Sequence, residues 1–176
     1  MKLLHLGLSL FLVACATAPR TPLPDLLVER LSWMDEVARY KQVRGLPVED
    51  APRETALLEA MAGKAETAGL PADDVRAFFA GQIEAAKQAQ HAWLRNSPQA
   101  STVDAPMPDL AGKVRPALDA LGNRLIVALA EARHQDDPHS ILQSAEARLQ
   151  SAGHEGAVRT PALQGLRAGL GLKDRS

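Results

Sequence analysis

Apolar residues recur at spacings of three and four along most of the chain, and this period limits the possible folds more than any other feature. One stripe contains Leu27, Leu31, Met34 and Ala38. A later one contains Leu110, Val114, Leu118, Leu121, Leu125 and Leu129. Such spacing places side chains on one face of an α-helix. Aromatic residues, which are enriched in strands together with β-branched ones, make up only 3% of the chain. We therefore predict an all-α protein.

Proline and glycine divide the periodic stretches. They mark breaks at 45–47, 69–71 and 96–108, they bound a short helix between 138 and 153, and a last helix with weak ends is expected from about 159. A chain of 176 residues with 46% apolar content can bury one core. We expect a single helical domain of about five to six helices, with core helices over 25–96, a loop over 97–108 and C-terminal helices over 109–176 that complete the same domain.

The first residues differ from the rest. Lys2 precedes an apolar run that ends at Leu12-Val13-Ala14-Cys15, and this run is too short to cross a bilayer. It predicts a secretory signal over 1–14, and its ending resembles the lipobox of bacterial lipoproteins, in which Cys15 would be lipidated. Cleavage near Ala16 is the alternative. Residues 15–24 contain three prolines and are interpreted as a tether.

Several classes of function are disfavoured. The formal net charge of −1 gives no basic surface for nucleic acid. The sequence has no Gly-rich phosphate loop, HExxH or paired CxxC motif, and the histidines after the signal lack metal-ligand spacing. The serines and threonines have no partner set for nucleophilic catalysis. We expect no metal and no cofactor.

Two cations share a face of the first predicted helix. Arg30 and Lys41 lie eleven residues apart, which is about 1100° of helical rotation and so within about 20° of three full turns. Met34 and Val37 lie on the same side. Charge on a core-facing stripe is costly unless a partner satisfies it, so these cations indicate an anion-binding pocket.

Other polar groups could complete this pocket. Arg53 and Arg115 could bind carboxylates, Asp50 and Glu54 could accept a hydroxyl, and Gln90 could donate an amide N–H. Pro116 fits the first turn of a helix, so Arg115 is expected near a helix start or a kink. Taken singly, each residue could instead be a surface ion-pair partner or a boundary residue.

Together these residues resemble the all-helical (type II) chorismate mutases, and specifically their exported subclass. The resemblance covers roughly 26–95. It is carried by Arg30 with Lys41, by Pro47-Val48-x-Asp50-x-x-Arg53-Glu54, by Phe78-Phe79-x-x-Gln82-Ile83, and by Gln90. The segment Val114-Arg115-Pro116-Ala117-Leu118-Asp119 with Asn123-Arg124-Leu125 is similar to one by which exported members supply another arginine from the same chain.

The resemblance implies a Claisen rearrangement of chorismate to prephenate. It implies that Lys41 and Gln90 donate to the ether oxygen of the breaking C–O bond. Arg30, Arg53 and Arg115 would hold the two carboxylates, and Glu54, helped by Asp50, would accept the ring hydroxyl. The reaction needs no nucleophile, metal or redox cofactor, which agrees with the missing motifs.

Two positions depart from relatives. Ala86 stands where they often carry Ser or Thr, and Gln90 stands where some exported relatives carry Glu. An amide donates without needing a proton first, whereas a carboxyl must be neutral. We therefore expect flat activity from mildly acidic to mildly basic pH. Lys87 is interpreted as a solvated or wall residue.

The competing hypothesis is a non-catalytic helical lipoprotein of the periplasm that binds an anionic small molecule or a protein partner. A bifunctional enzyme is disfavoured because the part after the mutase core is short and helical. We expect an exported, periplasmic protein. It would meet a membrane only through its N-terminal lipid, with the outer membrane favoured by Ala16, and a homodimer is possible.

Overall fold

The computed structural model describes residues 21–97, 106–135 and 137–172. Every regular element formed by these residues is helical. The α-helices are α1 (Leu23–Ser32), α2 (Met34–Arg44), α3 (Ala51–Thr67), α4 (Ala72–Asn96), α5 (Arg115–Arg133), α6 (Pro138–Ser151) and α7 (Gly156–Gly169), and a π-helical turn, η2 (Leu110–Val114), leads directly into α5. The all-α prediction is confirmed.

The first predicted helix is divided at Trp33, so one expected helix is two. The Ser32 hydroxyl donates to the Glu29 carbonyl at 2.8 Å, which is the acceptor that the Trp33 N–H would use in an unbroken helix. That N–H turns to the Leu31 carbonyl instead. Trp33 keeps near-helical dihedrals, φ −76° and ψ −11°, so α1 and α2 remain one interrupted rod. Counted this way, the fold has the six helices at the upper end of our expectation.

The start of α1 also differs from the prediction, because the helix begins at Leu23 rather than Asp25. Pro24 lies in the first turn, where its missing N–H costs nothing. Leu23 is 5% exposed. The last two residues assigned to a tether therefore belong to the packed helix.

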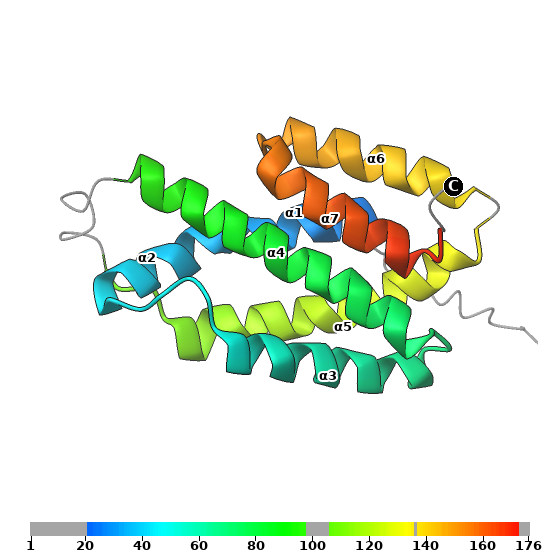
Figure 1. The fold of residues 1–176 in the computed structure, drawn as a ribbon, viewed down its shortest axis with the longest axis horizontal. Coiled ribbons are helices and arrows are strands. Elements are labelled where there is room, and N and C mark those ends of the chain that lie inside the picture. The colour runs from blue at the N-terminus through cyan, green and yellow to red at the C-terminus, as the bar shows by residue number, and fades with distance from the viewer. Residues whose placement is uncertain (1–20, 98–105, 136, 173–176) are drawn as a thin grey trace, which may run out of the picture.

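Helix α4 is the centre of the molecule. It runs through the middle of Figure 1 with α7 along one side, α3 along another, and α2 against its C-terminal half, while α1 contacts α5 and α6. Phe78 and Phe79 are fully buried in the core and pack edge to face with ring centroids 4.9 Å apart. One continuous core thus includes the C-terminal helices.

The contact of α4 with α7 brings the two backbones unusually close. A Cβ atom at Gly81 would lie 2.5 Å from the Pro161 carbonyl oxygen, and one at Gly165 would lie 2.6 Å from the Phe78 carbonyl oxygen. Gln82, fully buried, donates from Nε2 to the Ala162 carbonyl at 3.0 Å. The two helices therefore lie in contact through their glycines.

The predicted N-terminal signal and part of the predicted loop lie outside the residues that the structure describes. The signal over 1–14, the lipobox and Cys15 lie outside the described residues, as do residues 98–105 of the predicted loop. Ser97 and the segment 106–109 are not helical. Within 21–97, 106–135 and 137–172, no helix combines the length and the apolar character needed to cross a bilayer.

Candidate active site

A cavity of about 110 Å³ lies where α1, α2, α3, α4, η2 and the start of α5 meet. The polar residues predicted for a substrate site all line it. They are Arg30, Lys41, Asp50, Arg53, Glu54, Gln90 and Arg115. The structure therefore brings together residues spread over much of the chain, whereas the predicted lipidation site, Cys15, is outside the described residues.

Arg30 is the most deeply placed cation of this cavity, at 6% exposed. Its Nε is buried and has no hydrogen-bond partner in the part of the chain that the structure describes. Burial, reinforced by the positive charge of Arg53 and opposed by Asp119, lowers the pKa of Arg30 to about 10. A guanidinium in this state would gain free energy from a carboxylate placed in the cavity.

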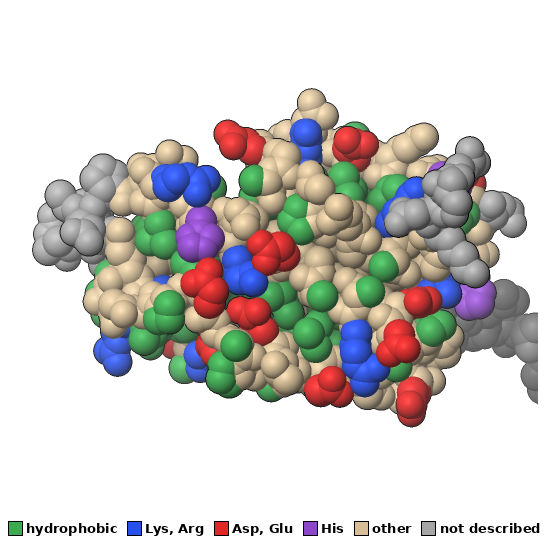
Figure 2. Space-filling model, viewed as in Figure 1, with side chains coloured by type: hydrophobic (Ala, Val, Ile, Leu, Met, Phe, Trp, Pro, Cys, Tyr) green, Lys and Arg blue, Asp and Glu red, His purple; other side chains and the backbone are tan. Residues whose placement is uncertain are grey.

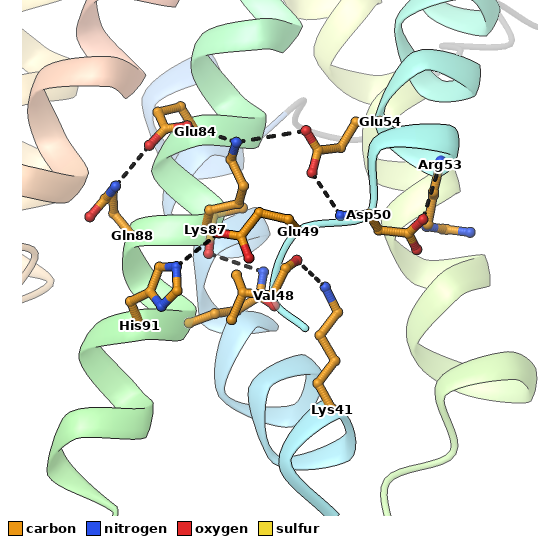
Figure 3. Close-up of polar contacts among 12 residues, drawn as sticks. Lys41, Val48, Glu49, Asp50, Arg53, Glu54, Glu84, Lys87, Gln88 and His91 are labelled. Atoms are coloured by element: carbon orange, nitrogen blue, oxygen red, sulfur yellow. Dashed lines mark hydrogen bonds and ion pairs between the residues drawn. The ribbon is translucent and has the colours of Figure 1, made fainter. Parts of the chain in front are cut away.

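Lys41 enters the cavity from the last turn of α2. Its Nζ donates to the Val48 carbonyl, in the segment that connects α2 to α3 (Figure 3). Burial lowers the pKa of Lys41, and the nearby carboxylates of Asp50, Glu54 and Glu49 partly offset that effect. The ammonium thus lies at the cavity wall and donates to a neutral carbonyl oxygen.

Gln90 faces the cavity from α4 and is 4% exposed. Its Nε2 donates to the Ala86 carbonyl at 3.1 Å and lies 3.7 Å from the Met34 sulfur. Its Oε1 is buried and has no hydrogen-bond partner among the described residues. The contacts of the amide N–H are thus a carbonyl of its own helix and a sulfur, which is a weak acceptor. A polar atom of a ligand in the cavity could replace them.

Asp50 is the N-cap residue of α3, and Glu54 lies in the first turn of that helix. The Asp50 side chain caps the helix by accepting from the Arg53 backbone N–H at 3.3 Å, and Glu54 Oε1 accepts from the Asp50 N–H at 3.1 Å. This reciprocal arrangement is close to a capping box. The cap fixes both carboxylates at the edge of the cavity.

Arg53 and Arg115 line the open side of the cavity, and both are exposed to solvent. Arg115 is the first residue of α5, next to Pro116 in the first turn, so its predicted place at a helix start is confirmed. Figure 2 shows that acidic and basic side chains and a histidine also gather on the surface where α4 passes the segment before α3.

Sequence reasoning missed several contacts made by residues of the cavity wall. Met34 was assigned to the core stripe, but it also contacts the Gln90 amide. The Val48 carbonyl binds Lys41. Lys87, interpreted as a solvated or wall residue, lines the cavity and lies 3.7 Å from Glu54 Oε2. The packing of α4 on α3 brings Lys87 to Glu54, a contact that the period of a single helix does not reveal.

Two other polar residues of the later resembling segment, Asn123 and Arg124, do not line this cavity. Arg124 binds Glu29 at 2.8 Å, and Asn123 accepts from Lys64 at 2.7 Å. Both side chains connect helices at the surface. Ala86 is buried in the cavity wall and offers no polar side-chain group there.

The arrangement can bind a small anion and stabilise negative charge that develops within it. One arginine of the lining is buried and two are exposed, and a lysine and an amide supply further N–H donors in the same lining. Such donors lower a barrier when charge develops on an oxygen in front of them, because they are already oriented and shielded from water.

The chain is similar to known proteins in sequence and in fold. The family model for chorismate mutase type II matches residues 23–91. The chain is 30% identical to a protein of Yersinia pestis named secreted chorismate mutase, over 77% of this chain and 76% of that protein. It is 34% identical to a monofunctional chorismate mutase of Enterobacter agglomerans, over 62% of this chain and 60% of that protein. The crystal structure of a chorismate mutase from Burkholderia phymatum has a TM-score of 0.70 and 32% identity, covering 85% of this chain and 93% of that one. The chain therefore belongs to the chorismate mutase type II family.

Proposed function

We propose that this protein is a chorismate mutase that converts chorismate to prephenate. In this Claisen rearrangement one C–O bond breaks and one C–C bond forms within a single molecule, and negative charge develops on the ether oxygen. The observation that carries the proposal is that Lys41 and Gln90, two N–H donors, line the same cavity as three arginines. A protein that only bound a dianion would need the arginines but not both donors.

In this mechanism Arg30, Arg53 and Arg115 bind the two carboxylates of chorismate. Arg30 binds one at the buried end, where its unpartnered Nε gains an acceptor. Arg53 and Arg115 act at the open side. Holding both carboxylates folds the enolpyruvyl arm over the ring and brings the reacting carbons together, which contributes through positioning.

Lys41 and Gln90 donate to the ether oxygen as the C–O bond breaks. Lys41 would exchange the Val48 carbonyl for this oxygen, and Gln90 would present an amide N–H from α4. Each oriented donor can contribute about 3 kcal/mol of transition-state stabilisation, by analogy with oxyanion holes. Glu54, with Asp50 beside it, accepts the ring hydroxyl.

The test follows the loss of chorismate absorbance with purified protein lacking residues 1–15. We expect turnover by this protein and strongly reduced rates for Lys41→Ala and Gln90→Ala. Unchanged absorbance with the parent would favour a non-catalytic anion-binding protein. A Gln90→Ala variant with full rate would preserve the function but contradict the mechanism.

We also propose that the protein is exported and that Cys15 carries a lipid. Export is supported by the apolar run before Cys15 and by the similarity to the Yersinia pestis protein named secreted chorismate mutase. Fractionation of cells and the mass of the N-terminal peptide test the lipid. A Cys15→Ser variant should leave the membrane fraction, whereas an unmodified N-terminus at Cys15 or Ala16 would contradict lipidation.

A homodimer is a further proposal, and it would not be needed for catalysis. The predicted substrate residues in the described part of the chain line one cavity within one protomer. We therefore expect specific activity to stay constant as the protein is diluted, while sedimentation velocity follows any dissociation. Activity lost in parallel with dissociation would mean that the site needs a partner.

A further inference from the structure

Lys87 connects two carboxylates across the α3–α4 contact. Its Nζ lies 2.9 Å from Glu84 Oε2 on its own helix and 3.7 Å from Glu54 Oε2 at the start of α3. The side chain of Lys87 is 23% exposed and that of Glu54 is 27% exposed, so solvent only partly screens the pair. Figure 3 shows the Glu54 carboxylate directed toward Lys87, with Lys41 reaching the connecting segment from the other side.

The Lys87 ammonium is itself held in place by Glu84. Gln88 Nε2 donates to Glu84 Oε1 at 2.7 Å, which leaves Glu84 Oε2 for Lys87. The hydrogen bond with Glu84, together with the charges of Glu54 and Glu49, raises the pKa of Lys87, so it stays cationic throughout the neutral range. A fixed cation is therefore always present beside Glu54.

Glu54 has a competing partner in the cavity. The negative charge of Glu54 raises the proton affinity of Lys41, so the two groups attract each other through the cavity. Without Lys87, this attraction would draw the Glu54 carboxylate toward Lys41. A Glu54–Lys41 ion pair would occupy the donor assigned to the ether oxygen and would withdraw the acceptor assigned to the ring hydroxyl.

We infer that Lys87 is a positioning residue that holds Glu54 away from Lys41, and so keeps one group as a hydroxyl acceptor and the other as a free donor. This inference rests on the proposed function of the same cavity. Glu54 is then held on both oxygens, by the Asp50 N–H and by Lys87. The role differs from that of a second catalytic cation, since Lys87 acts on substrate only through Glu54.

A double-mutant cycle with Lys87→Met and Glu54→Gln tests this role. Methionine keeps a straight apolar chain without the charge, and a glutamine at 54 cannot form an ion pair with Lys41. We expect Lys87→Met to lower kcat/KM about tenfold in the parent, mainly through kcat, and less than about twofold in the Glu54→Gln background. Lys87→Arg, which restores a cation, should recover most of the loss. Lys64→Met is the matched control, because Lys64 binds Asn123 outside this cavity.

Additive losses in the cycle, or full activity of Lys87→Met, would overturn the inference. A crystal structure of Lys87→Met tests it without turnover. Glu54 within about 4 Å of Lys41 Nζ, the usual limit for an ion pair, is expected. Glu54 still on the Asp50 N–H with Lys41 still on Val48 would overturn the inference. An inactive parent would refute the proposed function, and the crystal structure would still decide where Glu54 goes.

Discussion

Arg30 on α1 and Gln90 on α4 line the same cavity from different helices, and each has a buried atom without a hydrogen-bond partner in the described part of the chain. The atoms are Arg30 Nε and Gln90 Oε1. A buried polar atom left unpaired costs about 1–3 kcal/mol. A dianion bound in the cavity would supply an acceptor for Arg30 Nε and so remove part of that cost.

Replacement of Arg30 should raise stability while it removes activity. Because the guanidinium is buried and incompletely paired, Arg30→Met should increase the free energy of unfolding by about 1–3 kcal/mol. The same change should lower kcat/KM about 100-fold or more, since a buried charge-assisted contact to a carboxylate is lost. Urea denaturation and the chorismate assay measure the two effects.

The control for that experiment is Arg124→Met. Arg124 forms an exposed ion pair with Glu29 at 2.8 Å and does not line the cavity. We expect a stability change within about 1 kcal/mol and unchanged kcat/KM. An Arg30→Met variant less stable than the parent would mean that Arg30 stabilises the unliganded fold.

Gln90 should make the reaction insensitive to mild changes of pH. Gln90→Ala should lower kcat about 100-fold, as for loss of one oxyanion donor. Gln90→Glu should retain activity only where the new carboxyl is protonated, so its rate should fall as the pH rises. Rates measured from about pH 5 to 8 separate the variants, and a steep loss in the parent above about pH 6 would contradict Gln90 as donor.

Lys41 should titrate below an ordinary lysine in the free protein and higher in the complex. Burial lowers its pKa in the unliganded cavity, whereas a bound dianion favours the charged form and should raise it. Lysine side-chain NMR with and without prephenate measures the shift, and a Lys41→Arg variant assigns the resonance. Lys64, on the α3 surface, should not respond. No change on binding would place the anion away from Lys41.

The backbone contact of α4 with α7 should tolerate no side chain. Gly165→Ala would put Cβ 2.6 Å from the Phe78 carbonyl oxygen, so we expect a loss of about 2–4 kcal/mol or failure to fold. Gly63→Ala is the matched control inside α3, with nothing within 4 Å of the new Cβ, and should stabilise by about 0.5–1 kcal/mol. Denaturant titration compares them, and equal effects would mean that α7 readily moves.

The helices themselves could be predicted because each buries one face, and burial imposes a period that is visible in the residues. The division at Trp33 could not be predicted, because it depends on the hydrogen bond that the Ser32 hydroxyl donates to the Glu29 carbonyl. The close contact of Gly81 with Gly165 was also missed. Nothing near either glycine in the sequence identifies its partner across the fold.

The site could be predicted only in part from physical reasoning. The spacing of Arg30 and Lys41 indicated a shared face, and both line one cavity although their helix is interrupted between them. Assigning roles to the other residues needed the family resemblance. Lys87 beside Glu54 depended on how α3 and α4 approach each other, which is a property of packing rather than of either helix.

The glycine contact between α4 and α7 has a consequence for the geometry of catalysis. Gln90 and Lys87 lie on α4, and each residue added to a helix advances its direction by about 100°. With no Cβ between the backbones at Gly81 and Gly165, α4 can fit α7 at only one rotational phase. The C-terminal helix therefore sets the angle at which the Gln90 amide, the proposed donor, faces the cavity. An insertion of one residue between Gly81 and Gln90 would turn that amide away from the cavity, and it would also rotate those of the core residues Ala85, Ala86 and Ala89 that follow it.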